Sequence, residues 1–409
     1  MSRGEIAVLG GGAAGLAAAV MLARQGFSVT VYERAPRVGR KLLATGNGTC
    51  NITNIHAAPS RYHGEDPAFV APALAAFGPA RAMAFFASLG VVCVPRPDGR
   101  VYPLCAQASA VLDCLRAECA ALGVTERCDT PVTAIRPGFT LVTPAGERRA
   151  DRVAVATGGA ASPSLGGTAE GYGLLTALGH RKTPLFASVT QICASSPLLR
   201  AVKGIRVEGT VTLLLNGRAV ARETGEILFA EYGLSGPAAL AVSRWAGDWE
   251  RQKKGTLVAR VDLLPECSEQ QVEAELIRRR RLPGRTLEEL LTGYLNKRVG
   301  QTALKATEIL PLSRPAASLT EGEAAALAKT IKGWDFTVTG TKGLGSAQVT
   351  AGGIATAGFD PVTMQSRLVP GLYALGEVLD VDGDCGGFNL QWAWSSAAAA
   401  ARHIGEEMP

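Results

Sequence analysis

Residues 5–33 read EIAVLGGGAAGLAAAVMLARQGFSVTVYE, and this stretch decides the fold. The short apolar run 6–9 is typical of a buried parallel strand. The Ala- and Leu-rich run 13–25 predicts a helix that ends at Gly26. Residues 27–32 alternate as a second strand, which Glu33 follows. The order strand, helix, strand predicts a βαβ unit at the start of the chain.

The turn between the first strand and the helix carries three glycines in the spacing G-x-G-x-x-G. Gly10 allows a tight turn, Gly12 lets the backbone approach a pyrophosphate, and Gly15 lets helix and strand pack closely. The helix begins at Ala13 and Ala14, where free N–H groups and the positive dipole end favour phosphates. Glu33 can accept hydrogen bonds from a ribose diol, and its charge would repel a 2′-phosphate. The pattern predicts a dinucleotide site, and the alternative is a βαβ unit without a ligand.

A long polar, glycine-rich loop follows the second strand, over residues 34–54. Such loops normally face a ligand, because their backbone groups are costly to bury without partners. The basic residues could meet phosphate charge, and the alternative is a solvated surface loop. The residues of this loop that we expect to contact the cofactor are Arg34, Arg40, Lys41, Leu42, Gly46, Asn47, Cys50 and Asn51.

Two later strands also end in glycine-containing turns. The strand 152–156 ends in Thr157 and Gly158, and the strand 372–375 ends in Gly376 and Glu377. A glycine loop and an Ala-rich helix follow Glu377, which can accept hydrogen bonds from the hydroxyls of a polyol. The N–H groups at the start of this helix can donate to a ligand atom on which negative charge develops. The residues expected there are Gly387, Phe388, Asn389 and Leu390.

These segments resemble a known family. The run 39–43 (GRKLL), the segment 46–54 with Cys50 and Asn51, and the segment 386–396 are similar to the BaiN-type NAD(P)/FAD-dependent oxidoreductases of bacteria. More distantly, the chain resembles the fumarate reductase and succinate dehydrogenase flavoproteins. The resemblance implies FAD as cofactor, an oxidoreductase, and an α/β fold with a Rossmann-like FAD-binding domain. It also implies that the turn 350–354 approaches the flavin.

The middle of the chain changes character near Pro184. Short β-patterned runs cover residues 207–215, 217–222, 226–229 and 256–263, and helical patterns cover 268–281, 286–298 and 320–331. We therefore predict a discontinuous FAD-binding domain over 1–185 and 348–409. An inserted β-barrel or sheet is expected over 186–265 and 334–347, with a small helical subdomain over 266–333.

Composition limits the class of protein. The chain has 409 residues, a formal net charge of +6 and nine cysteines, none in C-x-x-C spacing. These features favour a cytoplasmic protein without disulfides or a metal site. The chain has no run of about twenty apolar residues, so we predict no membrane span.

The four-arginine run 278–281 is interpreted as a solvated helix C-terminus, with a nucleic-acid contact as the alternative.

The sequence predicts a flavoenzyme that passes hydride from NAD(P)H through FAD N5 to an unidentified organic acceptor. Because the chain has one dinucleotide fingerprint, the nicotinamide would bind only transiently. Two alternatives remain: a flavin-dependent protein that modifies or binds RNA, and a non-catalytic flavin redox sensor. A small-molecule substrate is expected, and nucleic acid is not. No catalytic residue is indicated, and we expect that neither Cys50 nor Cys385 is catalytic. The oligomeric state is not indicated.

Overall fold

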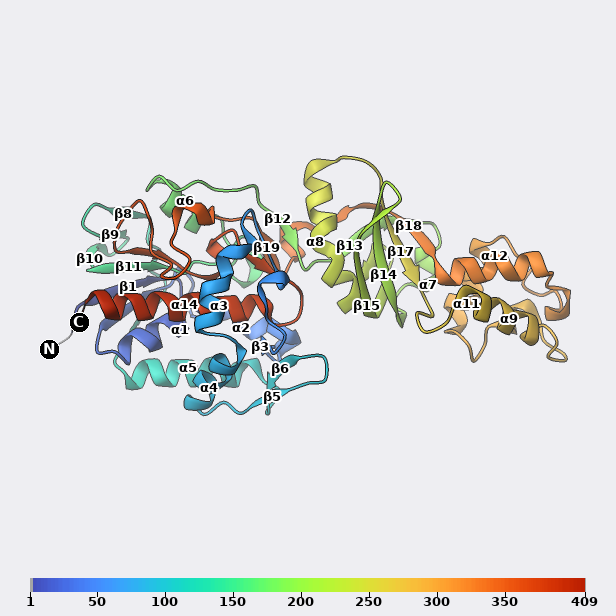
Figure 1. Cartoon of the computed structure of the whole chain (residues 1–409), viewed down its shortest axis with the longest axis horizontal. Coiled ribbons are helices and arrows are strands. Elements are labelled where there is room, and N and C mark those ends of the chain that lie inside the picture. Colours follow the sequence, from blue (N-terminus) through green and yellow to red (C-terminus); the bar gives the residue numbers. More distant parts are fainter. Residues whose placement is uncertain (1–2, 409) are drawn as a thin grey trace. The chain divides into compact units, whose positions relative to one another are not determined.

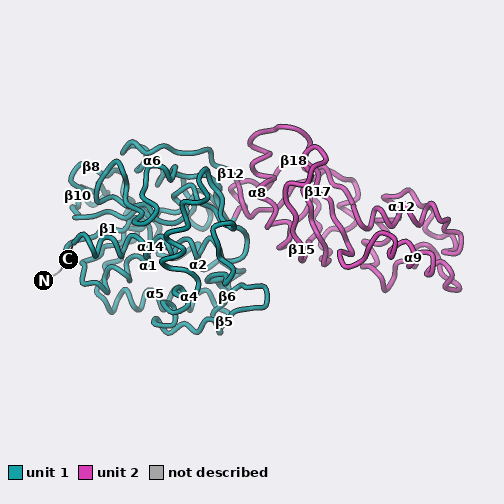
Figure 2. Tube along the Cα trace, in the orientation of Figure 1, with its two compact units in different colours: residues 1–186, 348–409 teal, residues 187–347 magenta. Residues whose placement is uncertain are grey.

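The computed structural model describes residues 3–408. The chain forms two compact units (Figure 2), of which unit 1 comprises Met1–Phe186 and Gln348–Pro409 and unit 2 comprises Ala187–Ala347. The chain passes between the units near β12 (Phe186–Ser188) and β19 (Val349–Ala351). Each unit has its own apolar core.

Unit 1 is built on a parallel sheet of five strands, so the α/β Rossmann-like fold is confirmed (Figure 1). Its central strand β1 (Glu5–Leu9) pairs with β2 (Ser28–Tyr32) on one side and β11 (Arg152–Val155) on the other. The outer strands are β20 (Leu372–Ala374), beside β11, and β7 (Thr125–Arg127), beside β2. Strands β1, β11 and β20 are buried almost throughout, as expected of a sheet covered on both faces.

The helices of unit 1 join the first and last parts of the chain. Helix α1 (Ala13–Ala23) packs against α14 (Phe388–Glu407) and α5 (Ala108–Ala121). Small side chains line α1, which is buried at nine of its eleven positions and can therefore lie close to its neighbours. The shorter helices are α2 (Arg40–Ala44), α3 (Ala71–Ala76), α4 (Pro79–Ser88) and α6 (Glu170–Thr176).

Small antiparallel sheets complete unit 1. One contains β8 (Ala134–Arg136), β9 (Thr140–Thr143) and β10 (Gly146–Arg149); another contains β3 (Thr53–Asn54), β6 (Arg100–Pro103) and β5 (Cys93–Pro95). The pair β4 (Tyr62–His63) and β21 (Asp382–Gly383) joins segments from the two ends of the chain.

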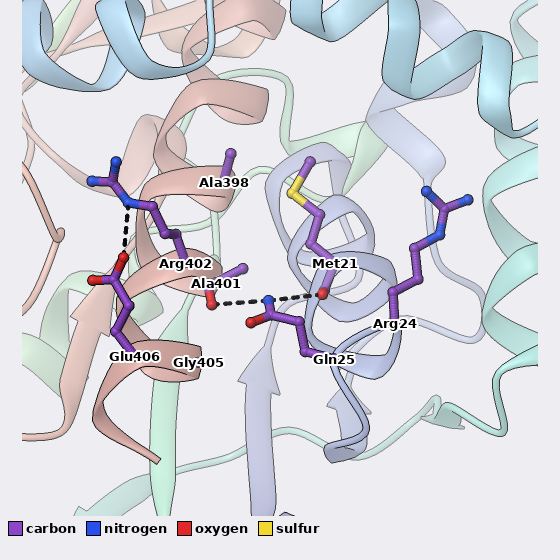
Figure 3. A pocket seen from close by; sticks show the side chains of 8 residues that line it. All are labelled: Met21, Arg24, Gln25, Ala398, Ala401, Arg402, Gly405 and Glu406. Atoms are coloured by element: carbon purple, nitrogen blue, oxygen red, sulfur yellow. Dashed lines mark hydrogen bonds and ion pairs between the residues drawn. The ribbon is translucent and has the colours of Figure 1, made fainter. Parts of the chain in front are cut away.

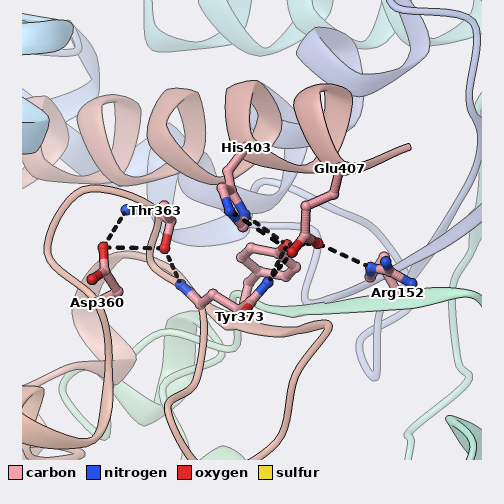
Figure 4. Close-up of polar contacts among 7 residues, drawn as sticks. Arg152, Asp360, Thr363, Tyr373, His403 and Glu407 are labelled. Carbon is pink, nitrogen blue, oxygen red and sulfur yellow. Dashed lines mark hydrogen bonds and ion pairs between the residues drawn. The ribbon is translucent and has the colours of Figure 1, made fainter. Parts of the chain in front are cut away.

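A polar cluster ties the end of α14 to the sheet (Figure 4). The hydroxyl of Tyr373, on β20, lies 3.0 Å from His403 Nδ1 and 3.1 Å from Glu407 Oε2. Gln365 donates to the same hydroxyl, and Arg152 Nε on β11 lies 3.4 Å from Glu407 Oε2. Burial raises the pKa of Tyr373 to about 12, so its hydroxyl keeps its proton. The cluster therefore fixes α14 against the strands β11 and β20.

Unit 2 contains a closed antiparallel barrel of six strands. In barrel order these are β13 (Ile192–Ser195), β16 (Gly233–Ser235), β15 (Arg218–Ala230), β14 (Arg206–Leu215), β17 (Leu257–Asp262) and β18 (Trp334–Thr341). The sequence predicts a break between residues 222 and 226, but β15 runs through it. Gly225 lies opposite Gly209 on β14, and such glycines let a long hairpin curve into a barrel without ending.

Helices complete unit 2. Helix α8 (Pro237–Gln252) packs on the barrel strands β14, β15 and β18. The helical part contains α9 (Glu269–Arg279), α10 (Leu287–Leu290), α11 (Lys297–Ala306) and α12 (Glu321–Lys332). Helices α9, α10 and α12 each start with a reciprocal capping box, which satisfies orphan N–H groups at these N-termini. Among residues 3–408, no single helix is long and apolar enough to cross a membrane. The two helices Pro67–Ala76 and Pro79–Ser88, with a bend between them, are long and apolar enough only when they are counted together.

Candidate functional site

The turn from β1 into α1 has the geometry of a phosphate cradle. A Cβ on Gly10 (φ 107°) would lie 2.5 Å from the Ala156 carbonyl oxygen, and one on Gly15 would lie 1.9 Å from the Gly10 oxygen. Both positions therefore require glycine. A Cβ on Gly12 would meet nothing within 4 Å, so the space in front of the helix is open. Helix α1 has neither a side-chain cap nor an acid in its first turn, which leaves its N–H groups for an anion.

The Glu33 carboxylate is fixed beside this turn. Its Oε2 accepts a hydrogen bond from the Gly11 N–H at 2.8 Å, and its Oε1 accepts one from the Ala35 N–H at 2.8 Å. Each oxygen keeps a further lone pair that can accept from a hydroxyl. Two backbone contacts thus fix the orientation of the acid at the end of β2.

The turn after β11 contributes an unsatisfied polar atom to the same region. Thr157 Oγ1 is buried and has no hydrogen-bond partner among the described residues. A Cβ on Gly10 would lie 3.0 Å from the Thr157 Cα, so the two turns are adjacent. Gly158 has φ 71° and open space at its Cβ position. Buried hydroxyls normally have partners, so an orphaned one beside an open glycine turn fits a bound ligand.

The basic residues after Glu33 meet protein groups. Arg34 and Arg40 donate to the carbonyl oxygens of Gly166 (3.3 Å) and Ser164 (2.8 Å), so both contact the loop before α6. Lys41 Nζ lies 2.7 Å from Glu377 Oε2. The first two cations hold the loop before α6 in place, and the third fixes a carboxylate.

Glu377, in the short helical turn η7 (Gly376–Val378), has a second anchor. Its Oε1 accepts a hydrogen bond from the Thr350 N–H at 2.8 Å. Thr350 Oγ1 in turn accepts from the Ala161 N–H at 2.9 Å. Lys41, Glu377 and Thr350 therefore connect the loop after β2, the turn after β20 and the turn 350–354 in one polar chain.

The loop 45–54 adopts a strained backbone. Gly46 and Asn47 have φ values of 55° and 53°, and Cys50 has φ 58°. The left-handed region is uncommon for residues with a Cβ and concentrates at functional sites. Leu42, which precedes the loop, is buried. Asn51 Oδ1 accepts a hydrogen bond from the Val101 N–H at 3.3 Å, which fixes the loop against β6.

The N-terminus of α14 packs directly on this loop. Gly387 has φ 99°, and a Cβ there would lie 2.6 Å from the Thr53 oxygen and 2.9 Å from Asn51 Oδ1. Thr53 Oγ1 donates to Gln391 Oε1 on α14 at 2.5 Å. The helix has no side-chain cap. Its N–H groups at Phe388, Asn389 and Leu390 can therefore serve a ligand.

The Asn389 side chain contacts the loop before α14 and is not available to a ligand at the helix N-terminus. Its Oδ1 accepts from the Gly383 N–H and its Nδ2 donates to the Gly383 oxygen, both at 2.8 Å. The side chain thus fixes the glycine loop before α14. Any cofactor contact of Asn389 is expected from its backbone.

Two groups in this region have raised pKa values. Burial raises the pKa of the Cys50 thiol to about 11, so this side chain is an uncharged filler at neutral pH. Tyr172, on α6, is buried, and its hydroxyl lacks a hydrogen-bond partner among residues 3–408. Burial raises its pKa, and the nearby Glu377 carboxylate raises it further.

The sequence prediction missed several polar residues near the start of α14. Asp384 Oδ1 lies 2.8 Å from His63 Nε2, and Arg61 also pairs with Asp384. The Tyr62 hydroxyl donates to the Phe388 oxygen at 3.0 Å. Strand β4, which holds Tyr62 and His63, has only two residues, so no periodic pattern could reveal it.

A hollow in unit 1 lies at the far end of α1 from Gly12 (Figure 3). Its residues are Met21, Arg24, Gln25, Ala398, Ala401, Arg402, Gly405 and Glu406. Gln25 Nε2 bridges the two helices by donating to the oxygens of Met21 and Ala401 at 3.0 Å. The hollow therefore belongs to the contact between α1 and α14. Among the described residues, no group of three or more His, Cys, Asp or Glu could hold a metal ion.

Comparisons with known proteins identify the family of the chain. The model of the HI0933-like protein Rossmann domain family matches residues 4–403. The 3-dehydro-bile acid delta(4,6)-reductase of Clostridium scindens is 37% identical over 408 residues, which cover 98% of this chain and 99% of that protein. The ribosomal RNA dihydrouridine synthase of Haemophilus influenzae is 32% identical, with 98% and 99% covered.

A solved structure shares the fold. The 3-ketosteroid delta1-dehydrogenase of Sterolibacterium denitrificans, in complex with 1,4-androstadiene-3,17-dione, matches 99% of this chain and 99% of its own. The TM-score is 0.52 and the identity is 13%, so this likeness concerns the fold alone.

The fold and site define the class of the flavin-dependent oxidoreductases with a discontinuous Rossmann-like domain. Within this class, the chain belongs to the HI0933-like family. The resemblance to the BaiN-type oxidoreductases is thereby confirmed.

Proposed function

We propose that the protein uses FAD to reduce a carbon–carbon double bond conjugated to a carbonyl group, with NAD(P)H as the reductant. The observation that carries the proposal is that α1 and α14 each begin after a glycine, Gly12 or Gly387, and have no side-chain cap on their N–H groups. The polar chain Lys41–Glu377–Thr350 connects the loop after β2 and the turn after β20 with the turn 350–354. This arrangement suits a long cofactor with a pyrophosphate and a ring that gains negative charge.

The proposed contacts follow from this geometry. The α1 N-terminus binds the pyrophosphate across Gly12, and Glu33 accepts from the adenosine ribose. Glu377 accepts from the ribityl hydroxyls. The N–H groups of Phe388 to Leu390 donate to the flavin at N1/O2. FAD, when bound, supplies the hydride-transfer chemistry, and the chain supplies position and electrostatics.

The substrate class rests on the names of the relatives. The reductase of C. scindens acts on a 3-dehydro-bile acid with delta(4,6) unsaturation, and the enzyme of H. influenzae makes dihydrouridine in ribosomal RNA. Both names describe saturation of a double bond that is conjugated to a carbonyl. We propose a small-molecule enone or dienone as the first candidate acceptor, and uridine in RNA as the second.

The contacts of the four-arginine run 278–281 support placing RNA second among the candidate acceptors. Arg278 pairs with Glu275 at 2.7 Å, and Arg280 donates to the Leu319 oxygen at 2.8 Å. Arg279 is buried and donates to the oxygens of Leu290, the last residue of α10, and of Thr292, just after it. Three of the four side chains thus stabilise the helical part of unit 2, which leaves little of the run for an RNA backbone.

The test uses the purified chain with its flavin. Heat-released flavin is expected to be FAD and not FMN. Anaerobic reduction by NADH and by NADPH is followed at the flavin band, which separates an enzyme from a redox sensor. The reduced protein is then mixed with a 3-oxo-4-ene steroid acid, its saturated counterpart, or a uridine-containing ribosomal RNA fragment.

Rapid reoxidation by the conjugated steroid acid and none by the saturated compound is the expected result. Reoxidation by RNA alone would make uridine the substrate. A protein that NAD(P)H reduces but that no conjugated acceptor reoxidises would contradict the proposed function.

A further inference from the structure

Strand β6 presents two polar side chains on one face. Its residues alternate, with Val101 and Pro103 buried and Arg100 and Tyr102 half-buried. Because successive side chains of a strand point to opposite faces, Arg100 and Tyr102 lie on the same face. Val101 faces the core, so the two polar residues face away from it.

This face of β6 borders the loops assigned to the flavin. A Cβ on Gly46 would lie 3.4 Å from Tyr102 Cε1, and one on Gly386 would lie 3.1 Å from Arg100 Nε. Asn51 fixes the strand by accepting from the Val101 N–H. Tyr102 therefore lies beside the loop 45–54, and Arg100, on the same face of β6, lies beside the glycine loop before α14.

The Tyr102 hydroxyl has no hydrogen-bond partner within residues 3–408, unlike the hydroxyls of Tyr62 and Tyr373, which contact Phe388 and Glu407. Tyr172 also lacks a partner but is fully enclosed, whereas Tyr102 is partly exposed. A half-buried hydroxyl without a partner can donate to a molecule that arrives from solvent. Burial raises the pKa of Tyr102, so the hydroxyl holds its proton at neutral pH, and the nearby Arg100 charge favours the phenolate.

We propose that Tyr102 is the proton donor for the reduction. This inference rests on the proposed function. Saturation of a conjugated double bond adds a hydride to one carbon and a proton to the other. The hydride brings two electrons from the reduced flavin. The Tyr102 O–H bond breaks, its proton forms the second C–H bond with the electron pair left on the substrate, and water reprotonates the phenolate.

The experiment compares two electron acceptors on the reduced holoprotein. Tyr102→Phe removes the hydroxyl and keeps the ring, so FAD content and the rate of reduction by NAD(P)H should match the unmodified protein. Ferricyanide accepts single electrons without a proton from the protein, and its reoxidation rate should be unchanged. Reoxidation by the conjugated steroid acid should fall by roughly 100-fold or more, the usual loss for a missing general acid. Tyr294→Phe, in unit 2, serves as the matched control.

The pH profile gives a second readout. Reoxidation by the conjugated acceptor should slow at alkaline pH as Tyr102 loses its proton, and Tyr102→Phe should lose this limb. Rates within twofold of the unmodified protein for Tyr102→Phe would overturn the role of Tyr102 and leave the proposed function standing. An unmodified protein that reduces neither the steroid acid nor uridine would overturn both.

Discussion

Lys41 Nζ lies 2.7 Å from Glu377 Oε2, although 336 residues separate the two in the sequence. The lysine belongs to the short helix after the first βαβ unit, and the glutamate follows the last strand of the sheet. The Lys41 side chain is 32% exposed and the Glu377 side chain is 20% exposed. The pair therefore joins the two halves of the discontinuous domain at the place that we propose for the ribityl chain.

Removing the lysine charge should loosen this carboxylate. Lys41→Met should weaken FAD binding about tenfold, or about 1.4 kcal/mol, because a charge-assisted hydrogen bond that orients Glu377 is lost. FAD affinity is measured by titrating the flavin-free protein. Lys329→Met, on an exposed position of α12, is the control. Equal affinities in both variants would show that Thr350 alone positions Glu377.

The open space at Gly12 allows a clean test of the phosphate cradle. Gly12→Asp should fold, since a Cβ there meets nothing within 4 Å, but it should lose FAD because its charge opposes the phosphates. Circular dichroism and flavin absorbance measure the two effects. Gly322→Asp, at another open glycine, should keep its flavin. A yellow Gly12→Asp protein would refute the assignment.

Glu33 serves both the fold and the predicted ribose contact. Glu33→Ala should weaken FAD binding by roughly 1.5–3 kcal/mol, because charge-assisted hydrogen bonds are lost. It should also lower the melting temperature of the flavin-free protein, since the N–H groups of Gly11 and Ala35 lose their acceptor. Unchanged stability without flavin, together with weaker binding, would assign the residue to the ligand alone.

We expect the buried Cys50 thiol to make the protein less stable at alkaline pH. Burial raises its pKa from an ordinary 9.0 to about 11 in the folded protein. Below pH 9 the thiol is protonated in both states, so its contribution is fully present. Between pH 9 and 11 only the unfolded state loses the proton, which should lower the free energy of unfolding by about 3 kcal/mol.

Denaturant titrations at pH 8, 9, 10 and 11 measure this effect. Cys50→Ala should flatten the decline of the free energy of unfolding with pH, relative to Cys105→Ala, which removes an exposed thiol.

Cys50→Ser and Cys385→Ser should keep FAD and most of the rate of flavin reduction. Loss of turnover with intact flavin would favour a dithiol mechanism.

Arg279 should matter for stability and not for RNA. Its guanidinium donates to the oxygens of Leu290 (2.9 Å) and Thr292 (2.6 Å) and lies over the Tyr294 ring. Arg279→Met should lower the free energy of unfolding by about 3 kcal/mol, because two carbonyl groups lose a charged donor. Arg281→Met, at an exposed position, should change it by less than about 0.5 kcal/mol. An effect of Arg281→Met on RNA affinity would revive the nucleic-acid interpretation.

The sequence predicted what local patterns determine. The apolar run before Gly10, the glycine spacing and the helix that follows define β1, α1 and β2, and the fold class is confirmed. The assignments of individual residues to the cofactor stay predictions. They gain support where glycine geometry leaves open space, as at Gly12 and Gly158.

Other features depend on contacts that no local pattern contains. The pairing of Lys41 with Glu377 and of β4 with β21 joins segments more than 300 residues apart. The turn that we expected at residues 223–225 is wrong, because β15 continues through it. The polar residues that suggested a turn lie in a barrel strand that has solvent on one side. Arg279 was expected at a solvated helix end, but the end of α10 and the residues that follow it cover its side chain.

The packing of α1 against α14 has a consequence for biosynthesis. A ribosome makes the phosphate turn at Gly12 at the outset, whereas β20 and α14 come more than 350 residues later. The whole barrel and its helices are translated in between and can fold first. A nascent chain thus carries half of the proposed flavin site for most of its synthesis. Stable capture of the cofactor must wait until α14 has emerged and docked, so flavin incorporation would report that translation has passed residue 407.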